Sequence, residues 1–183
     1  MPQCLLIIDI QNDYFENGNN PLVGSLEAAG KAQNLLSYFR GNGLPVCHIQ
    51  HLNLKPTSTY LVPNTTGCEI HELVRPRVDE TVIQKHFPNS FRDTSLMAFL
   101  KSKSIDKVVI AGMMTHMCID ATTRVAFDFG FGCTVIADAC ATKNLEIAGT
   151  VLPSDDVHNS FLAALKAYYA SVISADEFTK QMS

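Results

Sequence analysis

Three residues of different chemistry each follow an apolar segment of this chain. Asp9 directly follows the apolar run Cys4–Ile8, Lys85 ends a short apolar segment, and Cys118 comes shortly after a third run and a glycine turn. A thiol can attack a carbonyl carbon, a carboxylate can take the proton of the thiol, and an ammonium can keep that carboxylate ionised. Together the three residue types predict a Cys-Asp-Lys site for covalent hydrolysis of an amide-type bond.

Each of these residues also has a structural explanation. Cys118 could be a small buried residue, Asp9 a turn former or helix cap, and Lys85 a solvated loop lysine. The expected position of Cys118, in the first turn of a helix, favours the chemical interpretation. Unpaired N–H groups and the helix dipole stabilise a thiolate there.

Apolar runs that alternate with segments of helical period must position these side chains. The expected strands cover residues 4–8, 45–52, 80–84, 108–111, 133–137 and 171–173. The expected helices cover residues 25–40, 94–101, 116–128 and 155–170, with one or two helical turns within 144–152 and a short helix after a capping box at Ser174–Glu177. This alternation predicts an α/β fold with three αβα layers, in which a six-stranded parallel sheet carries helices on both faces. We expect residues 1–183 to form one domain.

The order of the strands brings the three chemical residues together. The carboxyl ends of parallel strands share one edge of the sheet, where sites of such folds gather. Asp9 follows the first expected strand, Lys85 the third and Cys118 the fourth. We therefore expect the three side chains to converge on one site.

Composition excludes several classes of protein. The chain has 183 residues, 46% of them hydrophobic and 17% charged, and a net charge of -4, which argues against disorder and against nucleic-acid binding. It has no apolar stretch near 18 residues and no basic leader before an apolar run, so we expect a cytoplasmic protein without a membrane segment. None of its six cysteines forms a Cys-x-x-Cys pair, and it has neither a dinucleotide fingerprint nor a phosphate loop, so we expect reduced thiols and no cofactor.

Four segments resemble those of the isochorismatase-like cysteine hydrolases. They read MPQCLLIIDIQNDYF, VIQKHFPNSF, VVIAGMMTHMCIDATTRVAFDFGF and TVIADACAT. The resemblance implies that Asp9, Lys85 and Cys118 are a catalytic triad on a six-stranded parallel sheet. It also implies a cis peptide between Met113 and Met114, an oxyanion hole made by the N–H groups of Met114 and Cys118, and a homo-oligomer.

The histidines of the second strand bear on a metal site. Nicotinamidases of this family carry a metal on an Asp-x-His pair and a further histidine, whereas this chain reads His48-Ile49-Gln50-His51. Residues three apart on a strand point to opposite faces. We therefore expect no metal at this pair, which argues against nicotinamidase activity.

The reaction and the substrate contacts are less defined. The leading hypothesis is a metal-independent hydrolase that cleaves a C–N bond of a small amide or ureide through a thioester on Cys118. Two alternatives stay open: vinyl ether hydrolysis of the isochorismatase type, which needs no thiol, and a non-catalytic small-molecule binder or thiol sensor. The segment Asn53–Gly67 could form a lid or a subunit contact. Five residues are candidates for substrate contacts: Gln11, Phe15, Phe91, His116 and His158. Gln11 could also orient Asp9.

Overall fold

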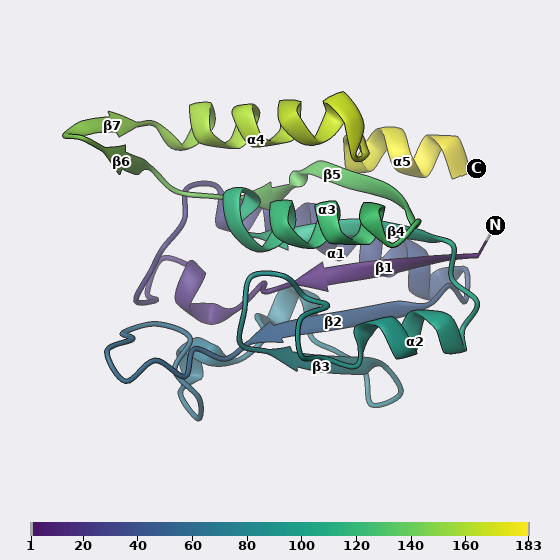
Figure 1. The fold of residues 1–183 in the computed structure, drawn as a ribbon. Helices are drawn as coiled ribbons and strands as arrows, with labels where there is room; N and C mark the ends of the chain where they lie inside the picture. Colours follow the sequence, from purple (N-terminus) through teal and green to yellow (C-terminus); the bar gives the residue numbers. More distant parts are fainter. Residues whose placement is uncertain (1, 183) are drawn as a thin grey trace.

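The computed structural model describes residues 2–182 and has a six-stranded parallel sheet at its centre (Figure 1). In spatial order, the strands are β3 (Thr81–Lys85), β2 (Val46–His51), β1 (Gln3–Ile8), β4 (Lys107–Met113), β5 (Gly132–Ala141) and β8 (Ser171–Ile173). All neighbouring strands of this sheet pair in parallel. The predicted α/β fold is confirmed.

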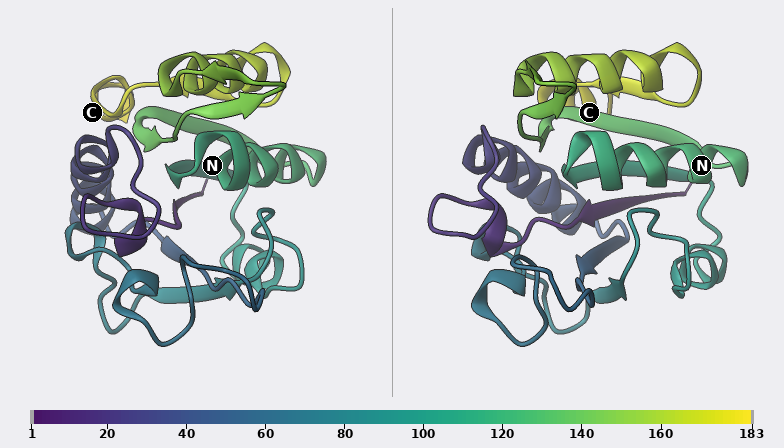
Figure 2. Two further views of the ribbon diagram at one scale, coloured as in Figure 1. Left: turned by 90° about the vertical axis from the view of Figure 1, so that its left-hand side faces the viewer. Right: turned by 60° about the vertical axis from the view of Figure 1, so that its left-hand side comes forward.

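Helices cover both faces of the sheet. They are α1 (Ser25–Gly41), α2 (Leu96–Ser102), α3 (Asp120–Asp128), α4 (Ser154–Tyr168) and α5 (Ala175–Met182). Figure 2 shows α1 and α5 on one side of the sheet and α2, α3 and α4 on the other. No helix in residues 2–182 is long and apolar enough to cross a bilayer.

The central strand β1 explains why the chain forms three layers. Every residue of β1 is buried, and successive side chains point to opposite faces of a strand. Leu5 and Ile7 pack in the core that includes α1, whereas Leu6 and Ile8 pack in the core that includes α2 and α4. A strand buried on both faces needs the continuous apolar run that this sequence has.

A long connection joins β2 to β3. Its first part lies at the carboxyl ends of the strands, and its later part contacts α1 on the way back to the start of β3. It contains two short 3-10 turns, η2 (Thr66–Cys68) and η3 (Glu72–Val74). A third turn, η1 (Asn12–Tyr14), follows β1 and contacts η2. Its backbone bonds to the connection, because the N–H of Asn12 donates to the carbonyl of Glu69 at 3.0 Å.

The prediction of helical turns within residues 144–152 is wrong. This segment forms an antiparallel hairpin of β6 (Leu145–Ile147) and β7 (Thr150–Leu152), which projects from the body of the molecule in Figure 1. The two residues between the strands, Ala148 and Gly149, have φ values of 50° and 78°. Positive φ at both central residues is the geometry of a tight hairpin turn, which overrides the weak helical pattern.

Candidate active site

The predicted convergence of Asp9, Lys85 and Cys118 is confirmed. The ammonium Nζ of Lys85 lies 2.6 Å from Oδ2 of Asp9 and 3.2 Å from Sγ of Cys118. All three side chains are buried. The residues come from the ends of β1 and β3 and from the turn after β4, as the order of the strands requires.

The backbone aims Asp9 at the site through a sharp turn at the end of β1. Asp9 has a φ of 54°, in the left-handed region that Asp tolerates better than most residues. Its N–H still donates to the carbonyl of Ile49 on β2, at 3.0 Å. The turn therefore redirects the side chain without detaching the chain from the sheet.

A close approach of two strands positions Cys118. Gly112 pairs with Ile8 and has a φ of 139°, and a Cβ there would collide with the carbonyl of Ile8. Only glycine allows β4 to lie this close to β1. The chain continues through the expected cis peptide between Met113 and Met114 into a π-helical turn, η4 (Thr115–Ile119), which carries Cys118.

The ammonium of Lys85 contacts four groups of the site. Besides Asp9 and Cys118, its ammonium contacts Nδ1 of His51 at 3.0 Å and the carbonyl of Phe87 at 3.2 Å. Because an ammonium can only donate, Nδ1 of His51 accepts and the ring is neutral. Burial lowers the pKa of His51 to about 4. The negative charge of Asp9 opposes this shift, and the positive charge of Lys85 adds to it.

The surroundings of Cys118 favour the protonated form of its thiol. Burial and the charge of Asp9 raise its pKa above the ordinary value, against the opposing effect of Lys85. Burial also opposes the charge of Lys85, but Asp9 and Cys118 raise the pKa of that ammonium overall. Burial and Asp9 thus favour the thiol, whereas Lys85 favours the thiolate.

Asp9 is placed to take the proton of that thiol. Its carboxylate is paired with Lys85 and also interacts with the side chain of Cys118. A carboxylate in contact with a thiol can take the proton of that thiol as the sulfur attacks.

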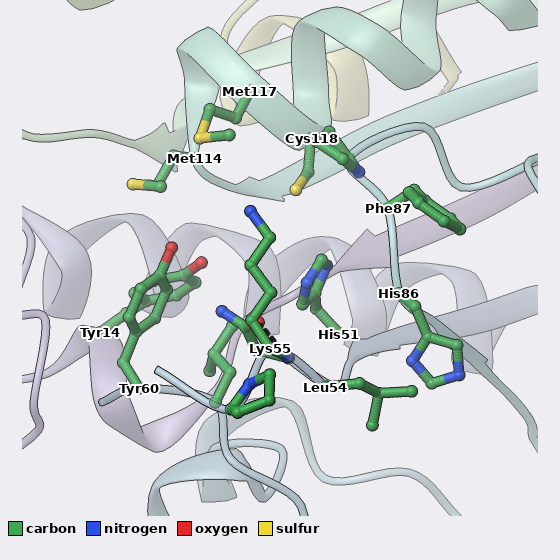
Figure 3. A pocket seen from close by; sticks show the side chains of 14 residues that line it. Tyr14, His51, Leu54, Lys55, Tyr60, His86, Phe87, Met114, Met117 and Cys118 are labelled. Atoms are coloured by element: carbon green, nitrogen blue, oxygen red, sulfur yellow. Dashed lines mark hydrogen bonds between the residues drawn. The ribbon is translucent and has the colours of Figure 1, made fainter. Parts of the chain in front are cut away.

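The triad lies at the side of a cavity of about 660 Å³. Figure 3 shows the thiol of Cys118 at its edge, with Met114 and Met117 on the same side and Tyr14, Lys55 and Tyr60 rising from the opposite side. The walls are mostly apolar, as is usual for a site that binds a small molecule. The lining residues are Tyr14, His51, Asn53, Leu54, Lys55, Pro56, Tyr60, Leu61, His86, Phe87, Pro88, Met114, Met117 and Cys118.

Comparison with known proteins relates this geometry to a family. The isochorismatase domain matches residues 3–177. The chain belongs to the isochorismatase family. It is 48% identical over 180 residues to an uncharacterized isochorismatase family protein, YddQ, of Bacillus subtilis (strain 168), covering 98% of this chain and 100% of the relative.

Two further relatives bear on fold and chemistry. A crystal structure assigned to the isochorismatase hydrolases, from Oleispira antarctica, superposes with a TM-score of 0.92 at 47% identity and covers 97% of this chain and 95% of its own. A maleamate amidohydrolase of Pseudomonas putida is 25% identical over 194 residues, covering 98% of this chain and 86% of the relative. This isochorismatase-family chain is therefore similar in sequence to a hydrolase of an amide.

Gln11 does not contact Asp9 in this isochorismatase-family site. Its amide nitrogen donates to the carbonyls of His51 at 2.9 Å and Cys68 at 2.7 Å, and its oxygen accepts the N–H of His51 at 2.8 Å. Gln11 thus ties the end of β2 to the connection after it and fixes the backbone of His51.

The other four substrate-contact candidates do not line the cavity either. Phe15 stacks on His71 with ring centroids 3.7 Å apart, and Phe91 packs against two other phenylalanines. Nδ1 of His158 hydrogen-bonds to Oγ1 of Thr115 at 2.9 Å. Nδ1 of His116 hydrogen-bonds to the hydroxyl of Thr142.

The two histidines of β2 do not share a site. Nε2 of His48 pairs with Oε2 of Glu80 at 3.0 Å, and Arg40 binds the same carboxylate. His51 instead offers a nitrogen within 4.8 Å of ligand atoms of Asp9 and Cys118, a set of types that can hold a metal ion. The ammonium of Lys85 already lies within about hydrogen-bond distance of all three, so a cation occupies the place that a metal would take.

Sequence reasoning missed four residues of the site. The sequence pattern indicates His51 only as part of a possible metal pair, and it does not single out Tyr14, Lys55 or Tyr60. Lys55 and Tyr60 lie within the segment Asn53–Gly67, which therefore forms a wall of the cavity. The polar Asn12–Tyr14 segment after an apolar strand was the one signal that could have pointed to Tyr14.

Proposed function

We propose that this protein is a cysteine hydrolase that cleaves the C–N bond of a small amide or ureide. The observation that supports this proposal most strongly is the buried arrangement of Asp9, Lys85 and Cys118, in which the thiol faces a small, mostly apolar cavity. An enzyme of this kind needs a nucleophile, a proton shuttle and room for a small carbonyl compound, and the site supplies each of them.

The first half of the reaction forms a thioester. Asp9 takes the proton of Cys118 as Sγ attacks the carbonyl carbon, and the carbonyl electrons move onto oxygen. The N–H groups of Met114 and Cys118, at a helix start where amides lack helical partners, would stabilise that oxyanion. When the tetrahedral intermediate collapses, the C–N bond breaks and Asp9 returns its proton to the leaving nitrogen.

The second half releases the acid. Water attacks the thioester and gives one proton to Asp9, and collapse of this intermediate breaks the C–S bond. The sulfur recovers that proton, so the free acid leaves and the resting thiol is restored. Lys85 stays charged throughout and balances whichever of Asp9 and Cys118 carries the negative charge.

The sequence similarity to a maleamate amidohydrolase supports amide hydrolysis. The contacts of Lys85 support a reaction without a metal, because its ammonium lies between the three groups that could bind one.

A screen of small amides and ureides, maleamate included, tests the proposal by ammonia release. Cys118→Ala and Asp9→Asn should each lower kcat by at least about 10³-fold, and mass spectrometry should find an acyl adduct on Cys118 of the wild type. Cys133→Ala, which removes a buried thiol away from the cavity, is the matched control and should leave kcat unchanged.

Other outcomes identify the alternatives. Full activity in Cys118→Ala together with loss in Asp9→Asn would indicate hydrolysis that needs no thiol, as in vinyl ether cleavage. Selective labelling of Cys118 by an electrophile with no turnover of any compound would indicate a binder or thiol sensor.

A further inference from the structure

The side chain of Lys55, which is exposed to solvent, enters the cavity on the side of the thiol. The side chain of Lys55 rises from the connection between β2 and β3 and ends in the space between Met114 and Cys118 (Figure 3). Hydrogen bonds within the connection fix its backbone next to this lysine. Oδ1 of Asn53 accepts the N–H of Lys55 at 3.3 Å, and the N–H of Asn53 donates to the carbonyl of Leu61 at 2.9 Å.

The charge of Lys55 is not neutralised by the protein. No aspartate or glutamate lines the cavity, and none of the ion pairs found in residues 2–182 includes Lys55. The nearest carboxylate of the site, Asp9, is already paired with Lys85. The free charge of the cavity is therefore positive.

Two phenol groups face the same space. The hydroxyls of Tyr14 and Tyr60 point toward the region that Lys55 enters (Figure 3), and neither forms a hydrogen bond within the described part of the chain. Burial raises the pKa of both, so each keeps the proton that it can donate. The cavity thus has three hydrogen-bond donor groups, one ammonium and two phenols, and no negatively charged side chain that accepts from them.

We propose that Lys55 binds a carboxylate of the substrate, which is then an amide that also carries an acidic group, such as the monoamide of a short dicarboxylic acid. The inference rests on the proposed amide hydrolysis and adds the substrate class. Lys55 pairs with the carboxylate, the tyrosines donate to its oxygens, and the apolar walls contact a short carbon chain. The amide carbonyl then lies at Sγ of Cys118.

Matched pairs of compounds test this assignment. Malonamate, succinamate and glutaramate each have a neutral twin in which a second carboxamide replaces the carboxylate. We expect the wild type to prefer the acid of the best pair by about 10- to 100-fold in kcat/KM, the range of one charge-assisted hydrogen bond. Lys55→Met should abolish this preference mainly through KM, and Lys55→Arg should keep it.

Lys101→Met is the control, because Lys101 is an exposed lysine like Lys55 but lies at the end of α2 and does not line the cavity, so the preference should stay unchanged. Equal kcat/KM for the twins in the wild type, or a preference that survives in Lys55→Met, would overturn the assignment.

Binding separates this inference from the proposed function. If the wild type hydrolyses none of the amides, calorimetry with succinate and succinamide still decides the role of Lys55. Tighter binding of succinate by the wild type, lost in Lys55→Met, supports carboxylate recognition even where C–N hydrolysis fails. Equal binding of both compounds overturns it even where another amide is hydrolysed.

Discussion

The carboxylate of Asp9 and the ammonium of Lys85 form a buried ion pair, with Oδ2 and Nζ 2.6 Å apart and neither side chain exposed. Removing two charges from water costs several kcal/mol per ion, so such a pair adds little to stability overall. Its contribution is chemical. It keeps a proton acceptor and a fixed positive charge beside the buried thiol at the edge of the cavity.

Breaking this pair should destabilise the fold. Lys85→Met leaves the charge of Asp9 buried without a partner and should lower the free energy of unfolding by about 3–5 kcal/mol. The double variant Asp9→Asn/Lys85→Met removes both charges and should recover part of that loss. Urea unfolding at pH 7 gives the free energy of unfolding of the wild type, the single variant and the double variant. A loss below about 1 kcal/mol in Lys85→Met would contradict the buried pair.

The ionisation of Cys118 should respond to Asp9. Burial and the charge of Asp9 raise the pKa of this thiol, whereas Lys85 lowers it. Asp9→Asn removes one raising cause and leaves Lys85 in place, so the thiolate should form at a lower pH than in the wild type. Iodoacetamide labelling of Cys118 across pH, read by peptide mass, gives the midpoints. Turnover should be lost in the same variant, and an unchanged labelling midpoint would contradict the coupling.

Asp13 should hold the cavity wall through Leu61. Its buried carboxylate accepts the N–H of Leu61 at 2.6 Å, and its other oxygen accepts two hydrogen bonds from Asn19. Asp13→Ala releases this part of the connection and should raise KM by about tenfold, with a loss of about 1–3 kcal/mol in unfolding free energy. Asn19→Ala removes one contact of Asp13 but keeps that to Leu61, so it serves as the control. If both variants have the same KM, Asp13 does not position the wall.

Glu80 should make stability depend on acid pH. Although burial alone would raise its pKa, hydrogen bonds from Arg40, the N–H of Arg77 and His48 lower it from 4.5 to about 2. A lowered pKa in the folded state stabilises the protein above about pH 4.5, and this contribution is lost as the pH falls toward 2. Urea unfolding at pH 7 and pH 3 should show a larger loss for the wild type than for Glu80→Gln. Equal losses would mean that Glu80 is not held ionised.

The strands and the triad could be predicted because local sequence determines them. A continuous apolar run such as that of β1 forms a strand buried on both faces, and a polar residue at its end must lie at the edge where sites gather. The capping box is confirmed as well, since Ser174 and Glu177 bond reciprocally at the start of α5. Localisation, oligomeric state and the extent of the domain stay predictions.

The cavity wall could not be predicted in the same way. Lys55 and Tyr60 belong to a connection whose path depends on distant contacts, such as that between Asp13 and Leu61. His51 was visible in the sequence, but its role depends on the contact with Lys85, 34 residues away. The hairpin of β6 and β7 depends on the backbone angles of Ala148 and Gly149, which periodicity alone does not report.

Strand β3 lies at an edge of the sheet, and Lys85 is its last residue. Edge elements open locally at a lower free-energy cost than the interior of a sheet. When β3 detaches, Asp9 loses its counter-ion while β1, β4 and the thiol of Cys118 stay in place. Catalytic competence should then vanish before circular dichroism records any melting, so turnover reports on the docking of one peripheral strand.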